Sequence, residues 1–184
     1  MAARPKGRVS LIAPRKELEP SYRSLIEEIT SRGERLVPFT LGFEYEKFDD
    51  LLKELDDNSK GIGLPKGFVA HSSFWLVRDK SEIVGVSNLR HELTPALRIE
   101  GGHIGYGIRP SLRRKGFGSQ ILRETLSRAR SRGLNRILLT CGKENIASVK
   151  IILANGGVLD SEAFHAPRNE IIQRYWIDLG ATAT

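Results

Sequence analysis

The sequence predicts an α/β protein of the α+β kind, in which a mixed, mostly antiparallel sheet carries helices on both sides. Short apolar runs of strand length alternate with segments whose apolar residues recur at helical spacing. Two of these runs, residues 73–77 and 82–89, are separated only by a short turn at residues 79–81, which indicates a hairpin. The length of 184 residues suits one domain, with residues 1–70 forming an N-terminal part and residues 72–179 the core.

The N-terminal part is expected to contain one strand, two helices and a loop. Residues 8–13 (RVSLIA) have the composition of a strand. Residues 20–32 place Tyr22, Leu25, Ile26 and Ile29 at helical spacing, and Gly33 follows where a helix commonly ends. Residues 46–55 form a second amphipathic pattern. Residues 58–67 then combine three glycines with a proline, which predicts a loop.

The core continues the alternation of strands and helices beyond the hairpin. A strand is expected over residues 102–108, and a helix from about Gly116 to Gly133. Residues 136–141 form another strand, and a further helix opens at Asn145. Residues 157–164 and 171–179 are expected to be the closing strands.

Composition limits the classes of protein that need to be considered. The apolar fraction of 40% and charged fraction of 28% are typical of soluble globular proteins. The apolar runs are far shorter than the ~20 residues that span a bilayer, and residues 1–6 lack the apolar stretch of a signal peptide. A single cysteine excludes an internal disulfide and a cysteine-rich zinc site. We therefore expect a cytoplasmic protein without a membrane partner or a bound metal.

Charge is distributed unevenly along the chain. The net charge is +7, yet residues 44–57 contain seven acids and two lysines and so carry −5. The remainder carries +12, which favours a protein that binds an anionic ligand through its basic body. The acidic segment is either a surface that attracts a cation or an ordinary solvated face.

The stretch Gly101–Ser119, GGHIGYGIRPSLRRKGFGS, combines a strand, a turn, a basic glycine loop and a helix start. A helix N-terminus presents unpaired N–H groups and a partial positive charge, which together favour phosphate. Glycines without a Cβ let a diphosphate approach those amides closely. The alternative is a basic loop that merely caps a helix. Neither GxxxxGK[ST] nor a GxGxxG after a first strand occurs, so a Walker loop and a dinucleotide-binding fingerprint are both excluded.

The order R-x-x-G-x-G directly after a strand resembles the acetyl-CoA loop of the GNAT acetyltransferase superfamily. The next segments also resemble that family, because a strand at residues 136–141 leads to a helix opened by Asn145 and Ser148 and ended by Gly156-Gly157. The resemblance covers about residues 72–179. The string NLRHEL at residues 88–93 is similar to a subgroup known only as predicted acetyltransferases. The resemblance implies that the strands ending near Ile108 and Cys141 splay apart into a V-shaped cleft.

The resemblance also implies which residues hold acetyl-CoA, the expected cosubstrate. The backbone N–H of Ile108 would stabilise the developing oxyanion, with Arg109 beside it. The loop from Arg113 to Ser119 would bind the diphosphate, with Gly116 and Gly118 closest. Asn145 and Ser148 would contact the pantetheine or phosphate side, although Asn145 is also a typical helix N-cap. The full expected set is Ile108, Arg109, Arg113, Arg114, Lys115, Gly116, Phe117, Gly118, Ser119, Asn145 and Ser148.

Candidates for the catalytic base are His103, His91 and Glu100. His103 is the first choice because an unperturbed imidazole titrates near neutrality and the residue lies on the central strand. A hydrogen-bonded core histidine is the competing interpretation. His71 and His165 are expected in surface loops. Many family members carry a tyrosine as general acid at the position of Ile152, so Tyr106 and Cys141 are the conceivable replacements here.

The implied function is transfer of an acetyl group to a primary amine, most simply of a small molecule, by direct attack in a ternary complex. The acidic residues 44–57 would draw a cationic amine to the acceptor side. Two alternatives stay open. One is a non-catalytic acyl-CoA sensor, and the other is a basic nucleic-acid-binding module, suggested by the sequence pI of about 9.8 but lacking any recognised motif. The protein is expected to be a monomer or a homodimer.

Overall fold

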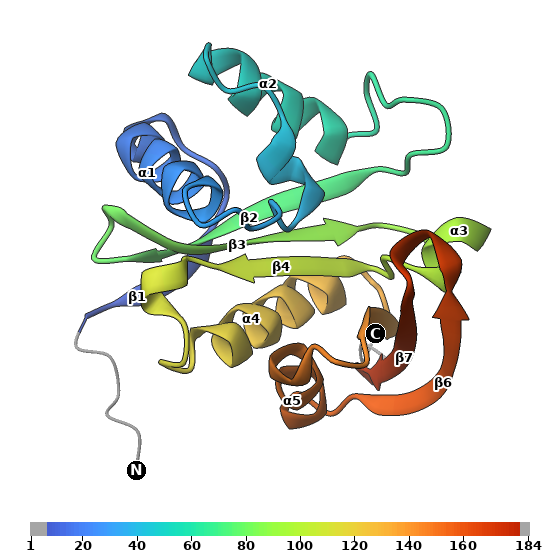
Figure 1. The fold of residues 1–184 in the computed structure, drawn as a ribbon. Coiled ribbons are helices and arrows are strands. Elements are labelled where there is room, and N and C mark those ends of the chain that lie inside the picture. The colour runs from blue at the N-terminus through green and yellow to red at the C-terminus, as the bar shows by residue number, and fades with distance from the viewer. Residues whose placement is uncertain (1–6, 181–184) are drawn as a thin grey trace.

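The computed structural model describes residues 7–180, which form two antiparallel sheets with helices on both sides (Figure 1). The first sheet has the order β1-β2-β3-β4, and every pairing in it is antiparallel. Its strands are β1 (Val9–Ile12), β2 (His71–Arg78), β3 (Glu82–Arg90) and β4 (Ile104–Ile108). Strand β4 is therefore an edge strand of this sheet.

The second sheet has the order β5-β7-β6 and is also antiparallel. Its strands are β5 (Arg136–Gly142), β6 (Val158–His165) and β7 (Glu170–Asp178). The two sheets meet at one point, where the N–H of His103 donates to the carbonyl of Leu138 at 2.8 Å. Beyond that point β4 and β5 belong to different sheets, which confirms the expected splay.

Two helices cover one face of the first sheet, α1 (Glu19–Thr30) and α2 (Phe48–Ser59), as Figure 1 shows. Their apolar stripes pack on β2 and β3, and the ring of Tyr22 lies 5.2 Å from that of Trp75. These side chains are almost fully buried because the 3.6-residue period keeps them on one side of each helix.

The opposite face carries α4 (Phe117–Ser131), with α5 (Ile146–Ala154) beside it (Figure 1). Phe117, Ile121 and Leu122 of α4 are fully buried in the core between the sheet and this helix. Helix α4 begins at Gly116, whose φ of 86° is left-handed and suits glycine, and Gly133 follows its C-terminal end in the same conformation.

The elements agree with those expected from the sequence, with a few differences at their ends. The short helix α3 (Pro95–Ile99) was not foreseen, since five residues carry too little periodicity. The expectation for His71 was wrong. It is the first residue of β2 and is buried, because the segment around Phe39 covers it.

Candidate functional site

The edge of β4 turns backbone amides toward the splay between the two sheets. Arg90 donates its N–H to the carbonyl of His103, and Arg109 donates its N–H to that of Val84. Hydrogen-bonded and non-hydrogen-bonded pairs alternate in an antiparallel ladder without register shifts. The residues between, Tyr106 and Ile108, therefore direct their N–H groups away from β3 and into the splay.

The two glycines of β4 form the side of the strand that faces the segment after α1. A Cβ on Gly107 would overlap the carbonyl oxygen of Val37, and one on Gly105 would lie 3.3 Å from Pro38. Glycine is therefore required for the chain at Val37 and Pro38 to lie directly against β4. This segment, together with α1, closes the cavity on one side of β4.

The N-terminus of α4 opens into the cavity on the other side. No side chain caps this helix within the described part of the chain, so its first-turn amides remain available to an anion. Around Gly116 no protein atom lies within 4 Å of where a Cβ would be. At Gly118, by contrast, a Cβ would meet Ile151 of α5. Gly116 thus leaves space for a ligand, whereas Gly118 lets the two helices pack closely.

Helix α5 forms the far wall and contacts β4 through one side chain. Asn145 caps this helix by accepting the N–H of Ser148 at 3.1 Å. The hydroxyl of Ser148 lies 3.1 Å from that of Tyr106, whose ring crosses the splay from β4. Burial raises the pKa of Tyr106 to about 12, so this phenol keeps its proton at neutral pH. Burial likewise raises the pKa of the Cys141 thiol.

These walls line a cavity of about 610 Å³ with residues from the α1 side, from β4 and from the α5 side. One wall comes from α1 and the segment after it, the middle from β4, and the other wall from the basic loop, α4 and α5. The lining residues are Leu25, Ile29, Glu34, Arg35, Val37, Leu41, Tyr106, Gly107, Ile108, Arg113, Arg114, Gly116, Gly118, Ser119, Asn145, Ala147, Ser148, Lys150 and Ile151.

Comparison with protein families identifies this arrangement. A model of the acetyltransferase (GNAT) family matches residues 34–155, which is well over half of the chain. The chain belongs to the GNAT acetyltransferase family. GNAT N-acetyltransferases are acetyl-CoA-dependent acyltransferases, and the chain is assigned to this enzyme class with acetyl-CoA as cosubstrate. None of the curated proteins compared with the chain matches it.

Solved GNAT structures share the fold over nearly the whole chain. RimL, a ribosomal L7/L12 α-N-protein acetyltransferase in complex with coenzyme A, has a TM-score of 0.69 at 16% identity, covering 98% of this chain and 99% of its own. Spermidine N-acetyltransferase from Vibrio cholerae has a TM-score of 0.61 at 19% identity, covering 92% and 93%. YncA, a putative acetyltransferase from Salmonella typhimurium with acetyl-CoA, has a TM-score of 0.62 at 11% identity, covering 96% of both chains.

Most of the residues expected to hold acetyl-CoA line this GNAT cavity. Eight of the eleven lie on its walls, namely Ile108, Arg113, Arg114, Gly116, Gly118, Ser119, Asn145 and Ser148. Phe117 and Lys115 do not line it. The ring of Phe117 is buried in the core, so only its backbone faces the loop, and Lys115 bonds the carbonyl of Ser111.

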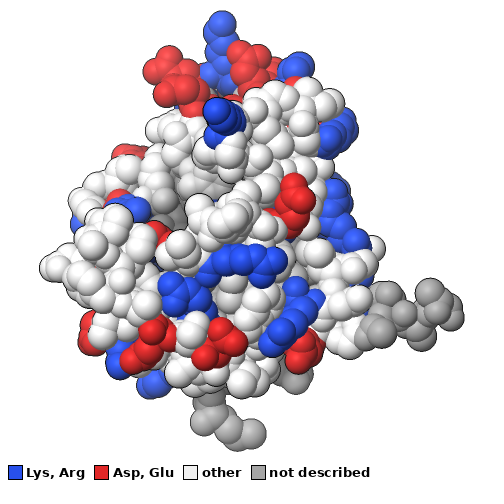
Figure 2. Space-filling view, turned by 90° about the vertical axis from the view of Figure 1, so that its right-hand side faces the viewer, with Lys and Arg blue, Asp and Glu red and all other residues white. Residues whose placement is uncertain are grey.

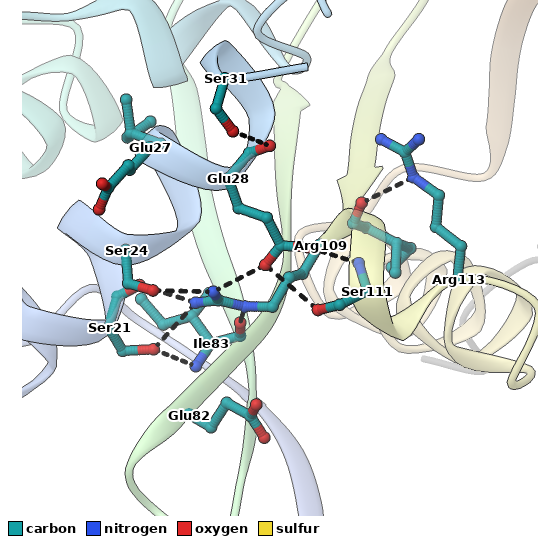
Figure 3. A network of polar contacts seen from close by, with 12 residues as sticks. Ser21, Ser24, Glu27, Glu28, Ser31, Glu82, Ile83, Arg109, Ser111 and Arg113 are labelled. Atoms are coloured by element: carbon teal, nitrogen blue, oxygen red, sulfur yellow. Dashed lines mark hydrogen bonds and ion pairs between the residues drawn. The ribbon is translucent and has the colours of Figure 1, made fainter.

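Arg109 does not line the cavity. Its side chain ties α1 to the sheet, as Figure 3 shows. Its guanidinium is buried and donates to the carbonyls of Ile83 and Ser21. It also forms an ion pair with Glu28 of α1 at 3.2 Å. The side chain is therefore a structural link, which corrects the expectation that it contacts the cosubstrate.

The three candidate bases do not line the cavity. His103 lies where the two sheets meet, and its Nδ1 accepts the N–H of Leu138 at 2.9 Å. Burial, with Arg98 and Arg90 adding to it, lowers the pKa of His103 to about 4. His91 bonds Ser72 and Arg132, and burial lowers its pKa to about 4 as well. Glu100 forms an ion pair with Arg168 at 2.6 Å. For His103, the interpretation as a hydrogen-bonded core residue fits this placement.

The acidic residues 44–57 also lie apart from the cavity. Helix α2 carries most of them at the top of the molecule, where Figure 2 shows acidic and basic side chains intermixed. Three lysines pair with these acids, Lys16 with Asp49, Lys53 with Asp57 and Lys60 with Asp56. In the described part of the chain they form a solvated face, so the expectation that they guide the acceptor has no support from this placement.

Sequence reasoning missed the charged residues that complete the cavity walls. Glu34 and Arg35 follow the glycine that ends α1, and Lys150 lies within α5. None of them belongs to a recognisable motif, and only the packing of the segment after α1 against β4 brings the first two to the site. Within residues 7–180 no helix is long and apolar enough to cross a membrane. The same part of the chain contains no group of His, Cys, Asp or Glu that could hold a metal ion.

Proposed function

We propose that the protein transfers the acetyl group of acetyl-CoA to a primary amine by direct attack within a ternary complex formed in this cavity. The observation that carries the proposal is the conjunction of the uncapped α4 N-terminus at Gly116 with the outward amides of β4. The first suits a diphosphate, and the second suits the carbonyl oxygen of a thioester. Both line a single continuous cavity.

The cavity walls suggest how acetyl-CoA is held. The amides at the start of α4, with Arg113, Arg114 and Lys150 nearby, would bind the diphosphate. The pantetheine arm would lie along the open edge of β4, and the N–H of Ile108 would donate to the acetyl oxygen as negative charge develops there. Apart from proton transfer, these residues act mainly by positioning and electrostatics, so the reaction needs no covalent enzyme intermediate.

Tyr106 is the residue we propose as proton donor to the departing thiolate. The neutral amine nitrogen attacks the thioester carbonyl, so that the C–N bond forms and the C–S bond breaks. The nitrogen then loses one proton to solvent, and the departing thiolate takes one proton. Tyr106 lines the cavity, and its hydroxyl is held by Ser148 and is protonated at neutral pH. Ile152 cannot take this role, because it is an aliphatic side chain that is fully buried.

The acceptor would enter from the α1 side. That wall is formed by the aliphatic side chains of Leu25, Ile29, Val37 and Leu41, with Glu34 and Arg35 beside them. Known relatives of this fold include a protein α-N-acetyltransferase and a spermidine N-acetyltransferase, so both an N-terminal amine and a small polyamine belong in an acceptor panel.

The test is an acetylation assay in which thiol release from acetyl-CoA is followed with a panel of primary amines. The panel contains spermidine, a lysine-free peptide with an unblocked N-terminus, and simple alkylamines. We expect thiol release that depends on the amine, together with CoA binding by calorimetry. Binding without transfer to any amine would favour the acyl-CoA sensor instead, and absence of CoA binding would overturn the proposal.

A further inference from the structure

An ion pair on the cavity wall joins the segment after α1 to the basic loop before α4. The carboxylate of Glu34, just after α1, accepts hydrogen bonds from both terminal nitrogens of Arg113. The distances are 3.0 Å from Nη1 to Oε1 and 2.5 Å from Nη2 to Oε2. The two residues are 79 positions apart in the chain, and both line the cavity. The bonds from Arg113 hold the pKa of Glu34 below its usual range, so the carboxylate is charged.

This pair occupies two groups that the two substrates need. Arg113 belongs to the basic loop proposed to bind the diphosphate. Glu34 is the single carboxylate among the described residues on the cavity wall, which otherwise carry four cations: Arg35, Arg113, Arg114 and Lys150. A cationic amine entering from the α1 side therefore finds its only counter-charge already paired.

The pair is exposed enough to exchange partners at low cost. The side chains of Arg113 and Glu34 are 45% and 33% exposed. Ion pairs as accessible as this one contribute about 1 kcal/mol or less. The Nε of Arg113 also donates to the carbonyl of Ile108 at 3.1 Å, which keeps the guanidinium at the end of β4. A diphosphate at the start of α4 would thus compete with Glu34 for the two terminal nitrogens.

We propose that the Glu34–Arg113 pair exchanges partners when the substrates bind, so that Arg113 pairs with the diphosphate and Glu34 receives the ammonium group of the acceptor. The inference rests on the proposed function and names the acceptor class, a primary amine basic enough to arrive as an ammonium ion. Each charge keeps one opposite partner throughout. Binding of the cosubstrate would therefore prepare the acceptor site.

A double-mutant cycle with CoA as the calorimetric probe tests the first half of the exchange. Glu34→Gln frees Arg113 in advance, so CoA should bind about two- to five-fold more tightly than to the wild type. In an Arg113→Gln background the same change should have no effect on CoA affinity. Glu27→Gln, an exposed position on α1 away from the cavity, is the control and should leave affinity unchanged. Equal tightening in both backgrounds would reveal a plain charge effect and would overturn the exchange, as would no tightening at all.

Titration with n-butylamine as the ammonium probe tests the second half. In the wild type, the amine should bind several-fold more tightly when CoA is saturating than when it is absent, and Glu34→Gln should abolish this difference. Equal affinity with and without CoA would overturn the inference while leaving acetyl transfer intact. If CoA itself fails to bind the wild type, the proposed function fails first and the inference fails with it.

Discussion

At the scale of single residues, Tyr106 is the side chain that joins the two walls of the cavity. Its ring starts on β4, and its hydroxyl meets Ser148 on α5. The two residues would contribute to proton transfer in different ways. The phenol would carry the proton, whereas the Ser148 hydroxyl only orients it.

Tyr106→Phe removes the proposed proton donor but keeps the ring. We expect kcat to fall by roughly 10²-fold with little change in the KM for acetyl-CoA, because the donor acts mainly in the transition state. Ser148→Ala should have a smaller effect on kcat. Steady-state kinetics on both variants provide the measurement, and an unchanged kcat in Tyr106→Phe would refute the assignment.

His103 is a residue whose effect should appear in stability and not in turnover. Its folded pKa of about 4 lies below the unfolded value of about 6.5, so the unfolded chain binds more protons between these limits. The stability that His103 contributes is therefore complete above pH ~6.5 and is lost as the pH falls toward 4.

Urea unfolding at pH 7 and at pH 4.5 measures whether stability falls with pH in this direction. The wild type should lose stability at the lower pH, on the order of 2 kcal/mol from His103 alone. His103→Asn cannot titrate but can still accept the N–H of Leu138, so its loss between the two pH values should be smaller. An equal loss in both proteins would show that His103 is not the group responsible.

At the scale of elements, α4 has two left-handed glycines, Gly116 before it and Gly133 after it, with φ of 86° and 85°. Neither has a protein atom within 4 Å of the space a Cβ would fill. A substitution at either glycine should therefore cause the same backbone strain. The two positions differ because only Gly116 lines the cavity. Comparing variants at the two positions therefore separates an effect on ligand binding from an effect on stability.

Gly116→Val and Gly133→Val form a matched pair of variants. Each should destabilise the protein by about 1–2 kcal/mol, because a residue with a Cβ resists this conformation. Only Gly116→Val should also weaken CoA binding, by roughly tenfold or more, since its side chain fills the space proposed for the diphosphate. Calorimetry with CoA, beside thermal unfolding of both, makes the comparison. Equal CoA affinity in the two variants would exclude the loop as the diphosphate site.

Most of these elements could be predicted from the sequence because each carries its own periodic pattern and boundary residue. Helix α4, for example, shows its buried stripe and its two flanking glycines directly. The residues of the cavity wall around the start of α4 could be named from the sequence for the same reason, since most of them are contiguous around Gly116. The opposite wall could not, because Glu34 and Val37 reach the cavity only where the segment after α1 packs against the glycines of β4. The histidines were misjudged because strand position does not reveal burial or hydrogen-bond partners.

At the scale of the whole molecule, Arg109 holds the layer of α1 against the sheet (Figure 3). Its buried guanidinium bonds groups on α1 and on β3, while Glu28 also accepts the N–H of Ser111. One side chain thus fixes the α1 wall of the cavity relative to β4, the strand whose edge we propose to bind the thioester. Losing it would affect both the stability of the fold and the shape of the cavity.

Arg109→Met should lower the free energy of unfolding by about 3 kcal/mol, because it leaves part of a buried polar network without its partner. Arg114→Met is the control, since Arg114 is exposed and makes no side-chain hydrogen bond within residues 7–180, and it should leave stability nearly unchanged. Urea unfolding of both variants measures the difference. Similar stability in the two would show that the network around Arg109 is dispensable.

The splay between β4 and β5 leaves the backbone edge of β4 without a neighbouring strand beyond His103. Such an edge is a template onto which another extended chain can add, including a strand of a second unfolding molecule. Whatever occupies the splay covers that template. If the cosubstrate lies along this edge as proposed, it should also protect the protein against self-association. We therefore expect light scattering of heated samples to rise later when CoA is present.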